Sequence, residues 1–143
     1  MRVKQLFSNS MEDHQLRNAI TSNFDTYRGC AIAIADIESE DLRIIASQAA
    51  DEMLNISGIQ SSYVLYRTGD IVNISARSMG AMNVQLIMEM LGGGGHQTMA
   101  AAQLSNISVS DAKVRLLQVI DQFYAQINAQ EEAPQERPEE MQN

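Results

Sequence analysis

Hydrophobic residues between positions 29 and 127 alternate between strand-like and helix-like spacing. The unbroken apolar run Cys30–Ala35 is too short for a helix and is typical of a strand buried on both faces. Ser39 is a suitable cap for a helix that follows, because apolar residues then recur at one-face helical spacing as far as Met53. This alternation predicts an α/β domain.

Two further apolar segments predict an antiparallel hairpin. Residues 61–66 and 71–77 flank Gly69 and Asp70, a pair suited to a tight reversal. The second segment alternates between two kinds of side chain, three apolar (Val72, Ile74, Ala76) and three polar (Asn73, Ser75, Arg77). Successive side chains of a strand point to opposite faces, so the polar row should form a face of its own.

The remaining pattern completes the expected fold. Asn83 should cap a short helix, residues 102–107 should form another strand, and a long amphipathic helix should start at Ser110. We therefore expect a mixed sheet of about four to five strands with helices packed on it. Residues 1–28 are expected to form a helical lead-in, and the Glu-, Gln- and Pro-rich residues 128–143 a disordered acidic tail.

Four consecutive glycines, Gly92 to Gly95, stand before His96. Glycines adopt left-handed and extended conformations, so their amides could converge on a phosphate or carboxylate, to which His96 would add a donor. The alternative is a flexible loop with an incidental histidine. A P-loop is excluded, because Lys and Ser or Thr do not follow the last glycine.

The polar row of the hairpin could border the same pocket as the glycine loop. Arg77 would offer a bidentate fork to a phosphate, and Ser75 and Asn73 further hydrogen bonds. The alternative is that any half-exposed antiparallel strand shows such alternation.

Charge and composition exclude several classes of function. The chain of 143 residues has 18 acidic and 10 basic residues and a formal charge of -8. A non-specific grip on long nucleic acid needs clustered Lys and Arg, so we expect none. One cysteine and two histidines make a metal site in this chain unexpected, and no apolar run approaches the roughly 20 residues of a membrane span. We expect this chain to be cytoplasmic.

The elements Ser75-Ala76-Arg77, Asn83-Val84-Gln85, Gly92 to His96 and Ala100-Ala101-Ala102 carry a family resemblance. From residue 29 to residue 127, the chain resembles the DHH-associated substrate-binding domain of the DHH phosphoesterase superfamily. It looks closest to membrane-anchored cyclic di-AMP phosphodiesterases, which hydrolyse the cyclic dinucleotide to linear pApA. In that family a separate DHH domain holds two manganese ions.

The resemblance implies roles for individual residues. Ser75 and Arg77 match the family's substrate-contacting element, and Gly93, Gly94, Gly95 and His96 match its phosphate-binding loop. Asn83 and Gln85 would be neighbours of the base.

The chain shows no Asp-His-His motif, so we expect either a C-terminal piece of a larger enzyme or a standalone remnant. The resemblance implies that the larger enzyme is membrane-anchored. This chain should grip cyclic di-AMP or the linear dinucleotide for an absent catalytic domain, bind no cofactor itself and hydrolyse nothing alone. Two alternatives stay open: an RNA-binding module like the C-terminal domain of alanyl-tRNA synthetases, and an assembly module that forms a homodimer through its helices.

Overall fold

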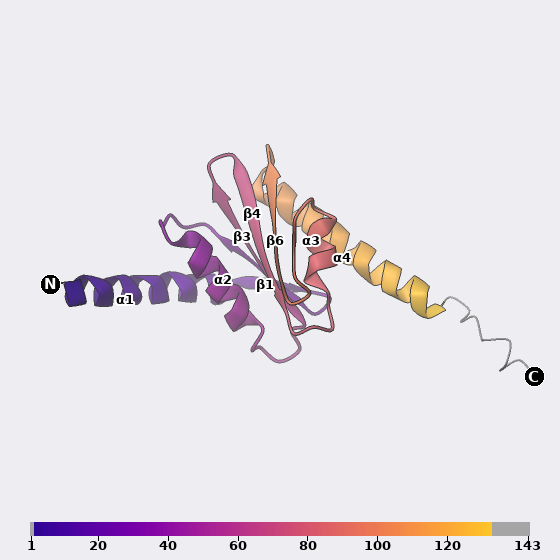
Figure 1. The fold of residues 1–143 in the computed structure, drawn as a ribbon, viewed down its shortest axis with the longest axis horizontal. Helices are drawn as coiled ribbons and strands as arrows, with labels where there is room; N and C mark the ends of the chain where they lie inside the picture. Colours follow the sequence, from indigo (N-terminus) through magenta and orange to yellow (C-terminus); the bar gives the residue numbers. More distant parts are fainter. Residues whose placement is uncertain (1, 133–143) are drawn as a thin grey trace, which may run out of the picture.

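A mixed six-stranded sheet, in the order β1-β2-β3-β4-β6-β5, forms the centre of the computed structural model, which describes residues 2–132 (Figure 1). The strands are β1 (Phe24–Tyr27), β2 (Cys30–Ala35), β3 (Ser61–Thr68), β4 (Ile71–Ser78), β5 (Gly94–Gly95) and β6 (Met99–Ser105). The helices are α1 (Arg2–Thr21), α2 (Leu42–Met53), α3 (Val84–Glu89) and α4 (Val109–Glu132). The α/β architecture expected from the sequence is confirmed.

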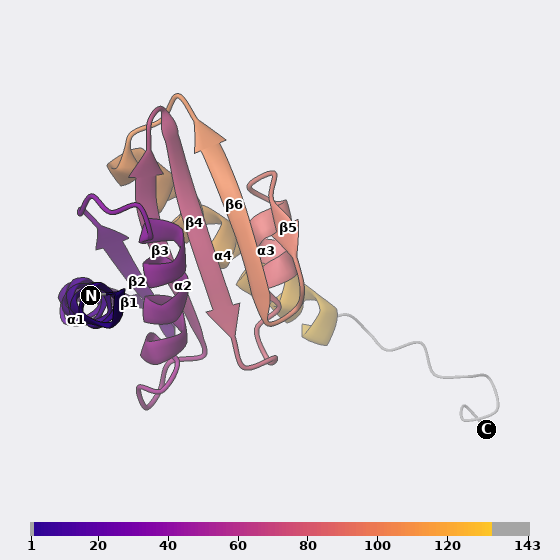
Figure 2. The same ribbon diagram turned by 60° about the vertical axis from the view of Figure 1, so that its left-hand side comes forward.

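The helices cover the sheet from both sides (Figure 2). One apolar core joins α3 and α4 to one face, and a second core joins α1 and α2 to the other face. The strand β2 contributes to both cores, because Cys30 and Ile32 face the first while Ala31 and Ala33 face the second. The prediction that this strand is buried on both faces is therefore confirmed.

The connection between β2 and β3 runs through α2 and leaves these two strands parallel, whereas every other neighbouring pair is antiparallel. The predicted hairpin is β3–β4, with Asn73 opposite Tyr66 and Arg77 opposite Ser62. Within the described residues, no helix is both long and apolar enough to cross a membrane.

Two strands were missed, which is why the sheet has six strands instead of four to five. The lead-in is not helical to its end, since residues 24–27 pair with β2 as β1. The other missed strand, β5, is only two glycines long. In addition, β6 starts at Met99 rather than at position 102, because a run of alanines gives no β-propensity signal.

Helix boundaries also differ from those expected. Ser39 does not cap α2 directly: its hydroxyl accepts from the amide of Asp41 at 3.1 Å, and the helix begins one residue later. By contrast, Asn83 caps α3 as predicted, accepting from the amide of Leu86. Helix α4 runs to Glu132, past the expected start of the acidic tail at residue 128. The rest of that predicted tail, residues 133–143, lies outside the described part of the chain.

A polar cluster fastens α4 to the end of β1. Asp121 accepts hydrogen bonds from the Tyr27 hydroxyl and from Arg28, both at 2.8 Å. The Arg28 guanidinium also lies over the ring of Tyr124, 4.3 Å from its centroid. The hydrogen bonds from Arg28 and then Tyr27 lower the pKa of Asp121 below its usual value.

Because of this lowered pKa, the free energy of unfolding should depend on pH. The Asp121 carboxylate should stabilise the fold at neutral pH, and this contribution should vanish as the pH falls through its lowered pKa, because the protonated group no longer accepts both bonds. In urea titrations, Asp121→Asn should lower the free energy of unfolding at pH 7 and make little difference at pH values below that pKa. Asp70→Asn, in the exposed β3–β4 turn, is the control. A gap between Asp121→Asn and wild type that stays constant down to low pH would contradict this assignment.

Candidate functional site

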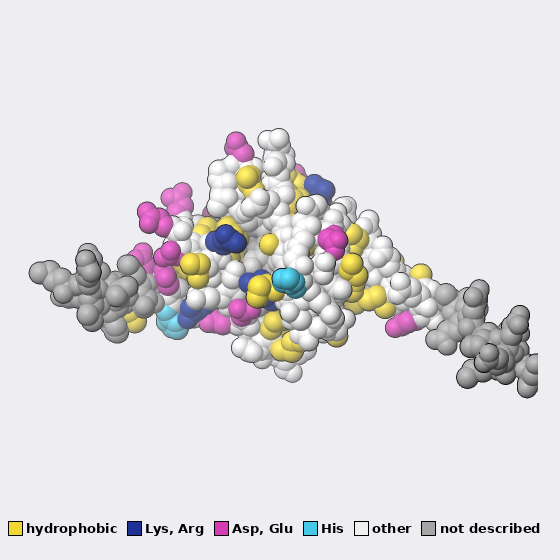
Figure 3. Space-filling model, in the orientation of Figure 1, with side chains coloured by type: hydrophobic (Ala, Val, Ile, Leu, Met, Phe, Trp, Pro, Cys, Tyr) yellow, Lys and Arg dark blue, Asp and Glu magenta, His cyan; other side chains and the backbone are white. Residues whose placement is uncertain are grey.

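A groove of about 600 Å³ lies on the sheet beside α2. Because α2 packs over the β2–β3 side of the sheet, the same face of β4, β6 and β5 remains open (Figure 2). Figure 3 views this face and shows basic side chains at two places near its centre, with a histidine beside one of them. The volume is in the range that holds a small-molecule ligand.

The alternation of side chains in β4 and β6 builds the floor of the groove. Val72, Ile74 and Ala76 enter the core with α3 and α4, so the polar row of β4 faces the groove, as predicted. In β6 the side chains pointing into the core are buried, and Met99, Ala101 and Gln103 between them are exposed on the groove side.

Arg77 is the most enclosed cation of the groove. Its side chain is only 10% exposed, and Nη1 donates to the carbonyl oxygen of Ala76 at 2.9 Å and to Oγ of Ser75 at 3.4 Å. Its Nε lies 3.1 Å from Oδ1 of Asp51 on α2, yet this buried nitrogen has no well-directed hydrogen bond to any described residue. A guanidinium held this way keeps donor capacity for an incoming anion.

Helix α2 supplies a second wall that the sequence did not predict. Ser47 lies 3.3 Å, oxygen to oxygen, from Ser75 across the helix–sheet boundary. Arg43, one turn earlier, also lines the groove and is exposed. Burial raises the pKa of the Tyr66 phenol on the groove floor, and the charge of Arg43 opposes that rise. Polar positions on an amphipathic helix gave no sequence signal that could have placed these residues at a site.

The first glycine of the run ends α3. Gly92 has a φ of +83°. Its amide donates to the carbonyl oxygen of Glu89 at 3.0 Å, and the amide of Gly93 donates to the carbonyl oxygen of Met88 at 2.8 Å. These two bonds form a Schellman cap. The cap needs a left-handed residue at position 92, a conformation that glycine adopts without strain. The amides of Gly92 and Gly93 are therefore already occupied, and they cannot join the converging set of free amides expected from the sequence.

Two of the next three glycines are required by the close packing of β5 on β6. A Cβ on Gly93 would lie 2.1 Å from the carbonyl oxygen of Ala101, and one on Gly95 would lie 2.5 Å from Cα of Ala100. Only Gly94 has open space where a side chain would be, and its φ is not in the left-handed region. The glycines therefore let a strand approach closely and leave a flat wall on the groove.

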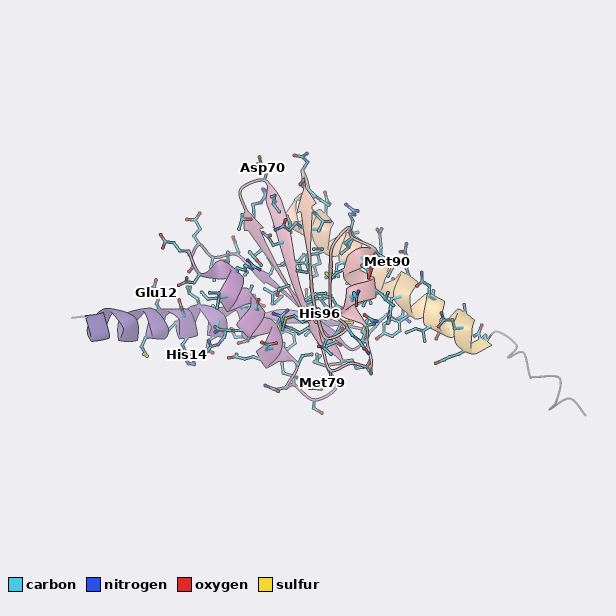
Figure 4. All side chains as sticks on the ribbon, viewed as in Figure 1. Glu12, His14, Asp70, Met79, Met90 and His96 are labelled. Carbon is cyan, nitrogen blue, oxygen red and sulfur yellow. The ribbon has the colours of Figure 1, made fainter. Side chains whose placement is uncertain are left out.

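His96 lies at the turn that follows this wall. Its amide donates to the carbonyl oxygen of Met99 at 2.6 Å, so this amide is also occupied, whereas its exposed imidazole lines the groove. Figure 4 places His96 at the centre of the face, between α2 and α3, and His14 away on α1.

The structure brings together most of the predicted site residues, but not all of them. Six line the groove: Asn73, Ser75, Arg77, Gly94, Gly95 and His96. Asn83, Gln85 and Gly93 do not line it; Asn83 caps α3 and Gly93 packs on β6. Sequence reasoning missed Gln103. This residue lay within the expected strand 102–107, but the sequence pattern did not assign which of that strand's side chains face a pocket.

The groove residues do not fit a metal centre. Among residues 2–132 no group of three or more His, Cys, Asp and Glu side chains is placed to hold an ion. His96 and Glu40 are the metal-ligating types on the groove lining, and a dinuclear centre needs several more.

Comparison with known proteins gives a consistent family assignment. The model of the "DHHA1 domain" family matches residues 28–126. The chain is 39% identical over 124 residues to the cyclic-di-AMP phosphodiesterase PdeA of Listeria monocytogenes, covering 85% of this chain and 19% of that protein. It is 46% identical over 97 residues to the cyclic-di-AMP phosphodiesterase GdpP of Geobacillus thermodenitrificans, covering 67% of this chain and 15% of that protein. The chain thus spans less than a fifth of these relatives' length.

Solved structures share the fold at low sequence identity. An exopolyphosphatase-related protein of Bacteroides fragilis superposes with a TM-score of 0.67 at 18% identity, over 81% of this chain and 36% of that one. The C-Ala domain of Aquifex aeolicus alanyl-tRNA synthetase superposes with a TM-score of 0.51 at 15% identity, over 68% of this chain and 96% of that one.

The two neighbouring glycines should respond differently to the same added methyl group. Gly93→Ala should lower the free energy of unfolding by roughly 1–3 kcal/mol, because the new Cβ overlaps the backbone of β6. Gly94→Ala meets no atom within 4 Å and should keep wild-type stability. Urea titration of the two variants checks this. Equal losses of stability in both would show that the run is not packed on β6 as described.

Proposed function

The chain belongs to the DHHA1 domain family, and we propose that it is the substrate-binding part of a cyclic-di-AMP phosphodiesterase. In this proposal its groove holds the dinucleotide while a separate catalytic domain of a longer protein cleaves it to linear pApA. The observation that carries the proposal is the enclosed Arg77 guanidinium on the floor of an otherwise open groove.

The groove offers complementary groups for a phosphodiester. Arg77 is partly desolvated, so an oxyanion beside it gains more than it would at a fully hydrated arginine. The Ser75 hydroxyl lies at the same guanidinium and can reorient to donate to the anion. The imidazole of His96 and the flat wall at Gly94 border the same space and allow the sugar-phosphate backbone close approach.

Asp51 helps to hold Arg77 before the ligand arrives. The Asp51 carboxylate is exposed and contacts Nε from the α2 side, so it orients the guanidinium without filling the groove. An incoming phosphoryl oxygen can then accept from the guanidinium at the groove side. The arrangement positions an anion, and among the described groove residues no serine hydroxyl is hydrogen-bonded to a histidine or a carboxylate as a nucleophile–base pair would require.

Hydrolysis is assigned to the part of the longer protein that this chain does not include. A manganese pair would supply an activated water for attack on the phosphodiester. The described residues offer no ligand set for it, so we place the metals in the catalytic domain. The relatives' greater length is consistent with this division of labour.

Binding of cyclic di-AMP should depend on the planar guanidinium group at position 77 and not only on its positive charge. Arg77→Lys keeps the charge and loses the planar fork, and we expect about a 10-fold weaker affinity by calorimetry. His96→Ala should weaken binding in the same direction while leaving the melting temperature unchanged, because its side chain is exposed.

Arg115→Lys, at an exposed arginine on α4, is the matched control and should bind as wild type does. Titration with tRNA tests the RNA-binding alternative. Unchanged affinity for cyclic di-AMP in both groove variants would place the site elsewhere, and tight tRNA binding by wild type would favour the alternative.

A further inference from the structure

Away from Arg77, the groove floor carries a network of amide side chains. Asn73 on β4 and Gln103 on β6 are register partners, and both line the groove together with Thr68. Asn73 is 7% exposed, whereas Gln103 is exposed to the groove. Neither Thr68 nor Gln103 belongs to the motifs that the sequence analysis singled out.

Hydrogen bonds determine how these amides are turned. The Nδ2 group of Asn73 donates to the main-chain carbonyl oxygen of Tyr66 at 3.3 Å and to Oγ1 of Thr68 at 2.8 Å. A carbonyl oxygen only accepts, so this contact defines which end of Asn73 is nitrogen. Oδ1 of Asn73 then accepts from Nε2 of Gln103 at 3.2 Å. Gln103 is thereby left with its Oε1 acceptor and one N–H donor.

We propose that Gln103 reads the base of the bound nucleotide and selects adenine; this rests on the proposed function. An amide with an acceptor and a donor side by side matches the N6 amino group and N7 of adenine. Guanine presents two acceptors, O6 and N7, on the same edge, so Oε1 of Gln103 would face O6 without a proton between them. Turning the amide over would only bring Oε1 against N7 of guanine instead, so neither orientation satisfies both acceptors. The hydrogen bond from Nε2 to Oδ1 of Asn73 holds the amide in one orientation.

The spacing of the floor suits this assignment. Along β4, Arg77, Ser75 and Asn73 lie opposite Met99, Ala101 and Gln103 of β6. Arg77 and Asn73 are four residue steps apart along the strand, about 13 Å, which is the scale of one extended nucleotide. Ala101 lies between Arg77 and Gln103 on the groove floor, and its small side chain leaves room for the sugar. The phosphate is thus held at Arg77 and the base at Gln103.

Base selectivity is the readout that separates this role from a structural one. Calorimetry with the linear dinucleotides pApA and pGpG should show wild type binding pApA about 10-fold more tightly. Gln103→Ala should bind both with similar affinity. Gln103→Lys should prefer pGpG, because an ammonium donates to O6 and N7 of guanine. The control Gln118→Ala makes the same change on the exposed side of α4 and should keep the wild-type preference.

The outcomes distinguish the two levels of the proposal. Both Gln103 variants should fold, since the side chain is exposed, and Gln103→Ala should lower the melting temperature slightly because Oδ1 of Asn73 loses its donor. If wild type binds both dinucleotides and the Gln103 variants keep its preference, the base-reading role is overturned and the substrate-binding function stands. If wild type binds neither dinucleotide nor cyclic di-AMP, both the function and the base-reading role are overturned.

Discussion

The structure depends on the two-residue period of one central strand, β4. Hydrogen-bonded to β3 on one side and β6 on the other, it places Val72, Ile74 and Ala76 in the core with α3 and α4. The same period obliges the intervening polar residues to face the groove. A slip of one residue in either ladder would bury the guanidinium of Arg77 in an apolar core. The same strand register therefore determines both the packing of the core and the residues that face the groove.

The glycine run shows what sequence reasoning could and could not reach. Four glycines before a histidine correctly marked the edge of the groove, since Gly94, Gly95 and His96 line it. The physical reason was different from the one expected, because the glycines are required by a helix cap at Gly92 and by close packing of Gly93 and Gly95 on β6. A run of glycines indicates that the backbone approaches another group closely. Only the tertiary contact shows that this group is strand β6 rather than a ligand.

Elements with strong local signals were predictable, and those that depend on tertiary pairing were not. The β3–β4 hairpin, the two-sided β2 strand and the Asn83 cap each follow from residues within a few positions of one another. The short edge strands β1 and β5, the alanine-rich start of β6 and the placement of Arg43 and Gln103 are decided by partners distant in sequence. The expected role of Asn83 beside a base stays a prediction, and its observed contact is with the α3 amide.

The central claim is that nucleotide binds across the open face of β4, β6 and β5. Amide chemical-shift mapping of the isotope-labelled chain, titrated with cyclic di-AMP, tests it directly. We expect the perturbed amides to cluster at Ser75, Arg77, Gly94, His96 and Gln103, while amides on the solvent side of α4 stay unchanged. Perturbations confined to α4 and β1, or none at saturating ligand, would contradict the account.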